Sequence, residues 1–134
     1  MSVVVAHQAS TIGQGALREA AREASLRGAP LAVVHVAEGV DLEAVEAHKS
    51  RVEGQISEVL SEIGLSDVPW TLQITTGEDV GEAVLDVVAT LEAELLVIGA
   101  RRRTPVGKLF LGSATQNIIL HADVPVLVVK APAA

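Results

Sequence analysis

The sequence contains no cysteine, no tyrosine, and only one tryptophan and one phenylalanine among its 134 residues. The absence of cysteine excludes a disulfide framework, a thiolate nucleophile and a cysteine-based metal site. Trp70 and Phe110 alone cannot supply the stacking platforms that bind single-stranded nucleic acid. These absences remove several classes of enzyme and binding protein before any motif is considered.

Long hydrophobic runs and an excess of basic residues are also missing. The apolar runs are far shorter than the ~20 residues needed to span a bilayer, and residues 1–6 lack the basic and apolar regions of a signal peptide. The formal net charge of −7 disfavours nonspecific binding to nucleic acid. We therefore expect a soluble cytoplasmic protein that forms a single domain over residues 1–134.

Apolar residues recur at two spacings along the chain, which predicts alternating strands and helices. Short apolar or β-branched runs predict strands over residues 2–6, 31–37, 69–75, 94–98 and 124–130. Apolar residues at helical spacing predict helices over residues 13–27, 41–63, 79–92 and 113–121. This alternation predicts a three-layer α/β/α fold, in which helices cover both faces of a parallel sheet.

Capping residues and one alternating strand refine this prediction. Asp79 followed by Glu82, and Ser113 followed by Gln116, have the spacing of helix capping boxes. Residues 69–75 alternate apolar and polar side chains, which indicates a half-exposed strand at the edge of the sheet.

The stretch 94–117 combines the features of a phosphate site. An apolar strand leads to Gly99, and Gly112–Ser113 opens a helix, whose unpaired N–H groups favour an anion. Four of the ten basic residues of the chain lie between them: Arg101, Arg102, Arg103 and Lys108. The alternative interpretation of this basic run is a solvated loop tip.

The position of this loop in the predicted sheet suggests a binding crevice. Ligands of parallel α/β sheets bind at the carboxyl ends of the strands, where the strand order reverses. The loops 7–11 and 99–112 both follow carboxyl ends of predicted strands. If the first and fourth strands are neighbours, these two loops face one crevice.

The four histidines, His7, His35, His48 and His121, do not have the spacing of a metal site. His35 lies in a core strand and is predicted to be a hydrogen-bonded structural residue. His7 is nearer the expected crevice and is a candidate ligand contact. We find no G-x-S-x-G elbow and no general acid–base pair, so catalysis beyond slow ATP hydrolysis or phosphotransfer is not expected.

Over essentially its whole length the sequence resembles the universal stress protein (UspA) family. The signature Gly-x2-Gly-x9-Gly-Ser/Thr reads here as Gly99-Ala100-Arg101-Arg102, nine residues, then Gly112-Ser113, and the stretches 77–99 and 121–130 are also similar. The resemblance implies the adenine nucleotide alpha hydrolase-like fold, with a five-stranded parallel sheet in the order 3-2-1-4-5. It also implies a homodimer formed through the last strand, Val124–Lys130.

One branch of this family binds ATP in the crevice, and another branch does not. The resemblance therefore implies a site for ATP with Mg²⁺, or for a related nucleotide. The residues it assigns to that site are Ala6, His7, Gln8, Ser10, Val36, Gly99, Arg101, Arg102, Gly112, Ser113 and Ala114.

Three positions depart from the ATP-binding pattern: Gln8 replaces an acid, Ala9 a glycine, and Arg102 the second signature glycine. Gln8 keeps an acceptor but loses a charge-assisted hydrogen bond, which is roughly twice as strong as a neutral one. Arg102 hinders backbone approach to phosphate, yet its planar fork suits phosphate. Three functions stay open: a nucleotide-binding stress-response module, a dimer that binds no ATP and acts through protein partners, and a nucleotide hydrolase.

Overall fold

The strands β1 (Val3–His7) and β4 (Leu95–Arg102) lie side by side at the centre of a parallel sheet. The computed structural model describes residues 1–7, 11–36, 42–75, 79–102, 109–110 and 113–130. Three further strands complete the sheet: β2 (Leu31–Val36), β3 (Trp70–Thr75) and β6 (Val126–Lys130). The order is β3-β2-β1-β4-β6 and every pairing in it is parallel, so the predicted order of the five strands is confirmed.

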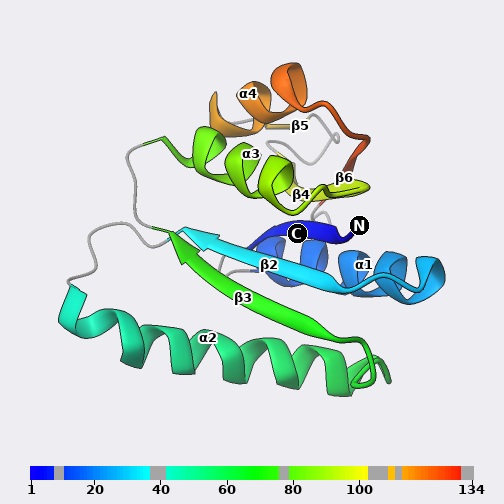
Figure 1. The fold of residues 1–134 in the computed structure, drawn as a ribbon, viewed down its shortest axis with the longest axis vertical. Coiled ribbons are helices and arrows are strands. Elements are labelled where there is room, and N and C mark those ends of the chain that lie inside the picture. The colour runs from blue at the N-terminus through cyan, green and yellow to red at the C-terminus, as the bar shows by residue number, and fades with distance from the viewer. Residues whose placement is uncertain (8–10, 37–41, 76–78, 103–108, 111–112, 131–134) are drawn as a thin grey trace.

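Two pairs of helices cover the two faces of this sheet (Figure 1). One face carries α1 (Thr11–Arg27) and α2 (Leu42–Glu62), and the other carries α3 (Val80–Thr90) and α4 (Ser113–His121). Each helix begins and ends within two residues of the predicted limits. The predicted α/β/α architecture is therefore confirmed.

Alternation along each strand divides the core into two clusters. Val3 and Val5 are fully buried on the face of α1 and α2, whereas Val4 is buried on the face of α3 and α4. The buried face of α1 consists mostly of alanines, among them Ala20 and Ala24. These small side chains let α1 lie close against both β1 and β4.

The segment after Ile98 differs from the predicted loop. Strand β4 continues to Arg102, and the short strand β5 (Leu109–Phe110) pairs with it antiparallel, with Arg101 opposite Phe110. A two-residue strand is too short to show a hydrophobic period, so the sequence pattern could not indicate it. The backbone of Arg101 and Arg102 is therefore held in a strand.

The ends of three helices follow the sequence signals. The Asp79 carboxylate accepts a hydrogen bond of 3.0 Å from the backbone N–H of Glu82, which confirms the predicted cap of α3. Gly28 and Gly64 follow α1 and α2 at φ values of 63° and 71°. This left-handed conformation favours glycine at the end of a helix.

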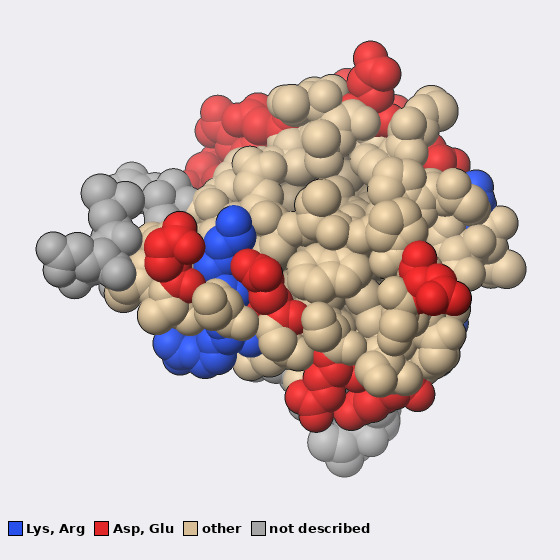
Figure 2. All heavy atoms as spheres, turned by 60° about the horizontal axis from the view of Figure 1, so that its bottom comes forward, with Lys and Arg blue, Asp and Glu red and all other residues tan. Residues whose placement is uncertain are grey.

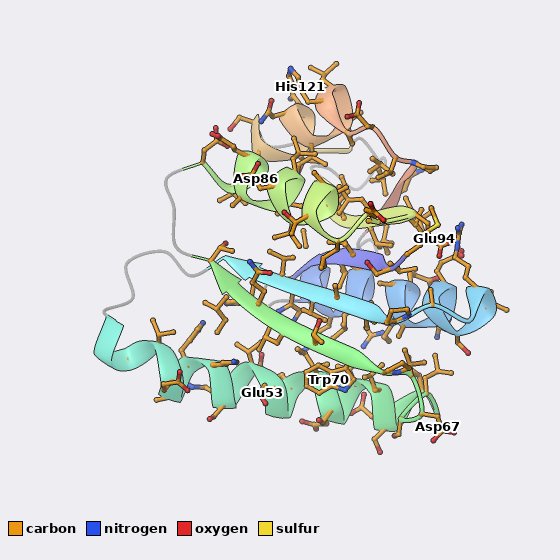
Figure 3. The ribbon with its side chains drawn as sticks, in the orientation of Figure 1. Glu53, Asp67, Trp70, Asp86, Glu94 and His121 are labelled. Atoms are coloured by element: carbon orange, nitrogen blue, oxygen red, sulfur yellow. The ribbon has the colours of Figure 1, made fainter. Side chains whose placement is uncertain are left out.

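An ion-pair cluster joins the end of α1 to the start of β4. Arg27 lies 3.1 Å from Glu94 and 3.2 Å from Glu23, and Figure 3 shows Glu94 beside the end of α1. These side chains are partly exposed, so the cluster adds little stability and mainly links the two elements.

The chain carries more acidic than basic side chains. Asp and Glu side chains are spread over the face shown in Figure 2, and on α2 the side chains of Glu46, Glu58 and Glu62 are exposed. An anionic ligand therefore needs a local concentration of positive charge. Within the ranges that the structure describes, no helix combines the length and apolar character needed to cross a membrane.

Candidate functional site

The two central strands separate before either of them ends. Their pairing runs from Val3 with Leu95 to Val5 with Val97, the last pair among the described residues. Beyond it, β1 still pairs with β2 up to His7, and β4 still pairs with β6 up to Ala100. The sheet therefore opens between the carboxyl ends of β1 and β4, where parallel α/β sheets bind ligands.

Each of the two strands has one partly exposed residue close to this opening. Val5 is buried and the next residue, Ala6, is partly exposed. On β4, Gly99 is partly exposed although Ile98 and Ala100 on either side are buried. Ala6 and Gly99 are two of the predicted site residues, and both lie beyond the last pair of β1 with β4.

The other predicted site residues fall into three groups. His7 ends β1, and the exposed Ser113 begins α4 with Ala114 beside it. The backbone alone places Val36 at the end of β2 and Arg101 and Arg102 on β4. Outside the described residues lie the predicted contacts Gln8, Ser10 and Gly112, together with Ala9, Arg103 and Lys108.

Gly81 holds the first turn of α4 close to α3. Gly81 is buried, and a Cβ atom at this position would lie 2.9 Å from Nδ2 of Asn117 and 3.3 Å from the carbonyl oxygen of Ala114. Any side chain here would push against the turn that carries Ser113 and Ala114. The absence of a side chain at Gly81 therefore lets the first turn of α4, the predicted phosphate-binding turn, pack closely against α3.

Three histidines form a hydrogen-bonded row on the face of α1 and α2. Nδ1 of His7 lies 3.0 Å from Nδ1 of His35, and Nε2 of His35 lies 3.0 Å from Nε2 of His48. His7 and His35 are register partners on β1 and β2 and are 3% and 6% exposed, whereas His48 belongs to α2 and is partly buried. The prediction that His35 is a hydrogen-bonded structural residue is confirmed.

Burial keeps the rings of His7 and His35 uncharged. Removal from water, with a smaller contribution from His35, lowers the pKa of His7 to about 4. Removal from water and the nearby His48 also lower the pKa of His35, and a hydrogen bond to the backbone of His7 offsets part of this shift. At neutral pH both rings are therefore neutral, and each has one N–H and one bare nitrogen.

The row does not have the geometry of a metal site. The hydrogen-bonded nitrogens face one another in pairs and not a common point. Among the residues that the structure describes, no group of three or more His, Asp or Glu could hold a metal ion.

The row was missed at the sequence level, although part of its signal is present. His48 lies four residues before Val52 and eight before Ile56, which places it on the buried stripe of α2. Period-two alternation likewise places His7 on the same face of β1 as Val5, and His35 on the corresponding face of β2. Only the strand register brings the three rings together.

A cavity also lies at the opposite end of the sheet, where α1 and α2 end. Its volume is about 350 Å³, and Gly28, Pro30, Gly64 and Asp67 contribute to its lining. It contains none of the predicted site residues, so it is separate from the opening between β1 and β4.

Comparison with known proteins agrees with this arrangement. The model of the Universal stress protein family matches residues 1–130. A universal stress protein of Mycolicibacterium smegmatis is 37% identical over 128 residues, which cover 96% of each chain.

Solved structures show the same fold. A universal stress protein from Archaeoglobus fulgidus has a TM-score of 0.75 and 32% identity, with 97% of this chain and 98% of that chain covered. A structure of the universal stress protein from Archaeoglobus fulgidus in complex with dAMP has a TM-score of 0.74 and 26% identity, with the same shares covered. The chain therefore belongs to the universal stress protein family.

Proposed function

We propose that this protein is a stress-response module that binds an adenine nucleotide in the opening between β1 and β4. The observation that carries the proposal is the separation of these strands after Val5 and Val97, at the switch point of the sheet. The Archaeoglobus fulgidus protein seen with dAMP shares the fold and supports an AMP-type ligand.

The start of α4 is the part of this site that suits phosphate. The helix has nine residues and begins at the exposed Ser113, so its first N–H groups and its dipole favour a negative charge. Arg101 and Arg102 lie on β4, two and three residues after Gly99. The charge of Arg101 is a local positive charge of the kind that a phosphate needs on an acidic molecule.

The specific ligand that we propose is ATP with Mg²⁺. Mg²⁺ is usually held by substrate phosphates together with a few protein groups, so a nucleotide can bring the ion with it. The residues proposed to hold the base and sugar are those at the end of β1, including Gln8, and Val36 at the end of β2. Gln8 can hold a hydroxyl group or a base edge through its amide.

Isothermal titration calorimetry tests the proposal. We expect saturable heat with ATP and Mg²⁺, or with AMP or dAMP, and weaker heat with GTP under the same conditions. The absence of heat with all adenine nucleotides at millimolar concentration would contradict it. Steady phosphate release from ATP that Ser113→Ala abolishes would instead support the hydrolase alternative.

A second candidate function is a homodimer that acts through protein partners without binding ATP. Strand β6 pairs with β4 on one side, and its residues Val126 to Val129 are partly exposed. On the neighbouring helix α4, Leu120 is 77% exposed. An apolar strand at the edge of a sheet favours pairing with a second copy, which supports a dimer with either function.

A further inference from the structure

The hydrogen bonds within the histidine row restrict which ring nitrogens can carry a proton. A neutral imidazole has one N–H donor and one bare acceptor nitrogen. His35 uses both of its nitrogens, Nδ1 toward His7 and Nε2 toward His48. While it is neutral, His35 must therefore donate to one neighbour and accept from the other.

Two arrangements satisfy this restriction. In the first, His48 donates from Nε2 to His35, His35 donates from Nδ1 to His7, and His7 carries its proton on Nε2. In the second, every donation is reversed: His7 donates from Nδ1 to His35, His35 donates from Nε2 to His48, and Nε2 of His7 is bare. The two arrangements differ at His7 in whether Nε2 is a donor or an acceptor.

We propose that His48 is a positioning residue that sets the tautomer of His7 through His35, and so decides whether His7 offers a donor or an acceptor at the end of β1. His48 lies on α2 and is only partly buried, whereas His7 is 3% exposed. The row thus connects a partly exposed helix position with the buried end of a central strand.

The energetic reason for this coupling is the cost of a mismatched pair. If one ring reversed alone, two N–H groups or two bare nitrogens would face each other at 3.0 Å. A buried polar group left without a partner has lost its hydrogen bonds to water and gained none in return, which is unfavourable. The rings therefore change tautomer together. This holds at neutral pH, where burial keeps the rings of His7 and His35 uncharged.

This tautomer would matter for ligand choice in the proposed site. His7 is the last residue of β1 and directly precedes Gln8. The donor form suits an acceptor such as a hydroxyl or carbonyl oxygen, and the acceptor form suits an N–H group. Only this consequence rests on the proposed function. The coupling from His48 through His35 to His7, which we call the relay, does not depend on a bound nucleotide.

Histidine ¹⁵N NMR on the ligand-free protein at pH 8.5 tests the relay with two substitutions of opposite character. His48→Lys supplies only donors, so we expect Nε2 of His7 to be protonated. His48→Glu supplies only acceptors, so we expect Nε2 of His7 to be bare. The Nε2 resonance of His7 should therefore move between the protonated and the unprotonated regions of the spectrum.

Two controls separate the relay from a general effect of charge. His121 donates from Nδ1 to the carbonyl oxygen of Asn117 at 2.9 Å on α4, outside the row, so its tautomer should not change (Figure 3). In a His35→Leu background, the substitutions at His48 should no longer affect His7.

Each result bears directly on the proposal. The same tautomer of His7 in both His48 variants would overturn it, as would a response that persists without His35. Lys and Glu are both good helix formers on the partly exposed α2. If either charged variant were unfolded, His48→Arg replaces the donor-only variant or His48→Asp the acceptor-only variant, and the tautomers expected for His7 stay the same.

Discussion

Gln8 and Arg102 are the two residues that we expect to limit ATP binding in the proposed site. Gln8 stands where the ATP-binding pattern has an acid, and Arg102 where it has a glycine. We expect Gln8→Asp together with Arg102→Gly to tighten ATP binding about tenfold, which corresponds to roughly 1.4 kcal/mol, because a charge-assisted hydrogen bond and a closer backbone approach are both restored.

Calorimetry measures this change, and Gln55→Asp together with Arg51→Gln, both on α2, is the matched control because it changes the net charge by the same amount away from the site. Unchanged or weaker binding in the double variant, with the control behaving like the parent, would show that these two departures are not what limits affinity.

His7 makes the stability of the fold depend on pH. Its pKa is about 4 in the folded protein against 6.5 for the ordinary side chain, so the unfolded chain takes up more protons between these values. The contribution of His7 is fully present above pH 6.5 and is lost as the pH falls toward 4. We expect this residue alone to account for about 2 kcal/mol of lost stability between pH 7 and pH 5.

Chemical denaturation of the parent and of His7→Leu at both pH values measures this contribution. The difference between pH 7 and pH 5 should shrink in His7→Leu and stay unchanged in His121→Leu, where an exposed histidine is removed. An equal pH dependence in all three proteins would contradict the assignment.

The histidines also show how much of a single residue's surroundings the sequence can predict. His35 was predicted to be a hydrogen-bonded structural residue because it lies in an apolar strand, and the structure confirms this. The partnership with His48 depends on how α2 packs over β2, which no spacing within one element reveals. Local pattern therefore places a side chain on a face, and tertiary packing decides what it meets.

At the scale of elements, the contact between α3 and α4 positions the proposed phosphate site. A methyl group at Gly81 would lie 2.9 Å from Asn117 and 3.3 Å from Ala114, so Gly81→Ala should displace the first turn of α4. We expect several-fold weaker nucleotide binding and shifted amide resonances for residues 113–117 without loss of the fold.

Gly54→Ala on α2 is the matched control, because a Cβ atom there meets nothing within 4 Å. That substitution should leave binding unchanged and stabilise the helix by up to about 1 kcal/mol. Normal binding and unshifted amides in Gly81→Ala would show that α4 is positioned by other contacts.

The elements differ in how much of them the sequence reveals. The four helices were predicted to within two residues because their apolar stripes are long and their ends carry Asp79, Gly28 and Gly64. The pairing of β4 with β5 was not predicted, since a strand of two residues has no pattern of its own. The sequence therefore predicted a loop in a part of the site where the backbone forms a pair of strands.

At the scale of the whole molecule, β6 is the edge through which we expect two copies to associate. We predict a dimer at tens of micromolar, formed by antiparallel pairing of the last strands, because an apolar edge strand favours such pairing. Light scattering coupled to gel filtration measures the mass. Val128→Lys should shift the protein to a monomer, since a charged residue in an edge strand opposes pairing.

Leu26→Lys is the control for this experiment, because Leu26 is 82% exposed on α1, outside β6. A parent protein that runs as a monomer would contradict the prediction. A dimer that Leu26→Lys disrupts and Val128→Lys does not would place the interface elsewhere.

The topology of the whole molecule was predictable in two steps. Alternating strands and helices indicated a parallel sheet, and the resemblance to universal stress proteins supplied the strand order, which the structure confirms. The separation of β1 from β4 after Val5 and Val97 is a property of the assembled sheet. It depends on how β1 and β4 pair with each other and with their other neighbours, so no single segment of sequence encodes it.

The location of a bound nucleotide tests the central claim most directly. Backbone amide resonances recorded during titration with AMP, and with ATP and Mg²⁺, identify the residues that meet the ligand. We predict saturable changes concentrated at Ala6 to Ser10, at Gly99 and at Gly112 to Ala114. An unchanged spectrum at millimolar nucleotide, or changes centred on the cavity beside Gly28 and Gly64, would contradict a nucleotide site between β1 and β4.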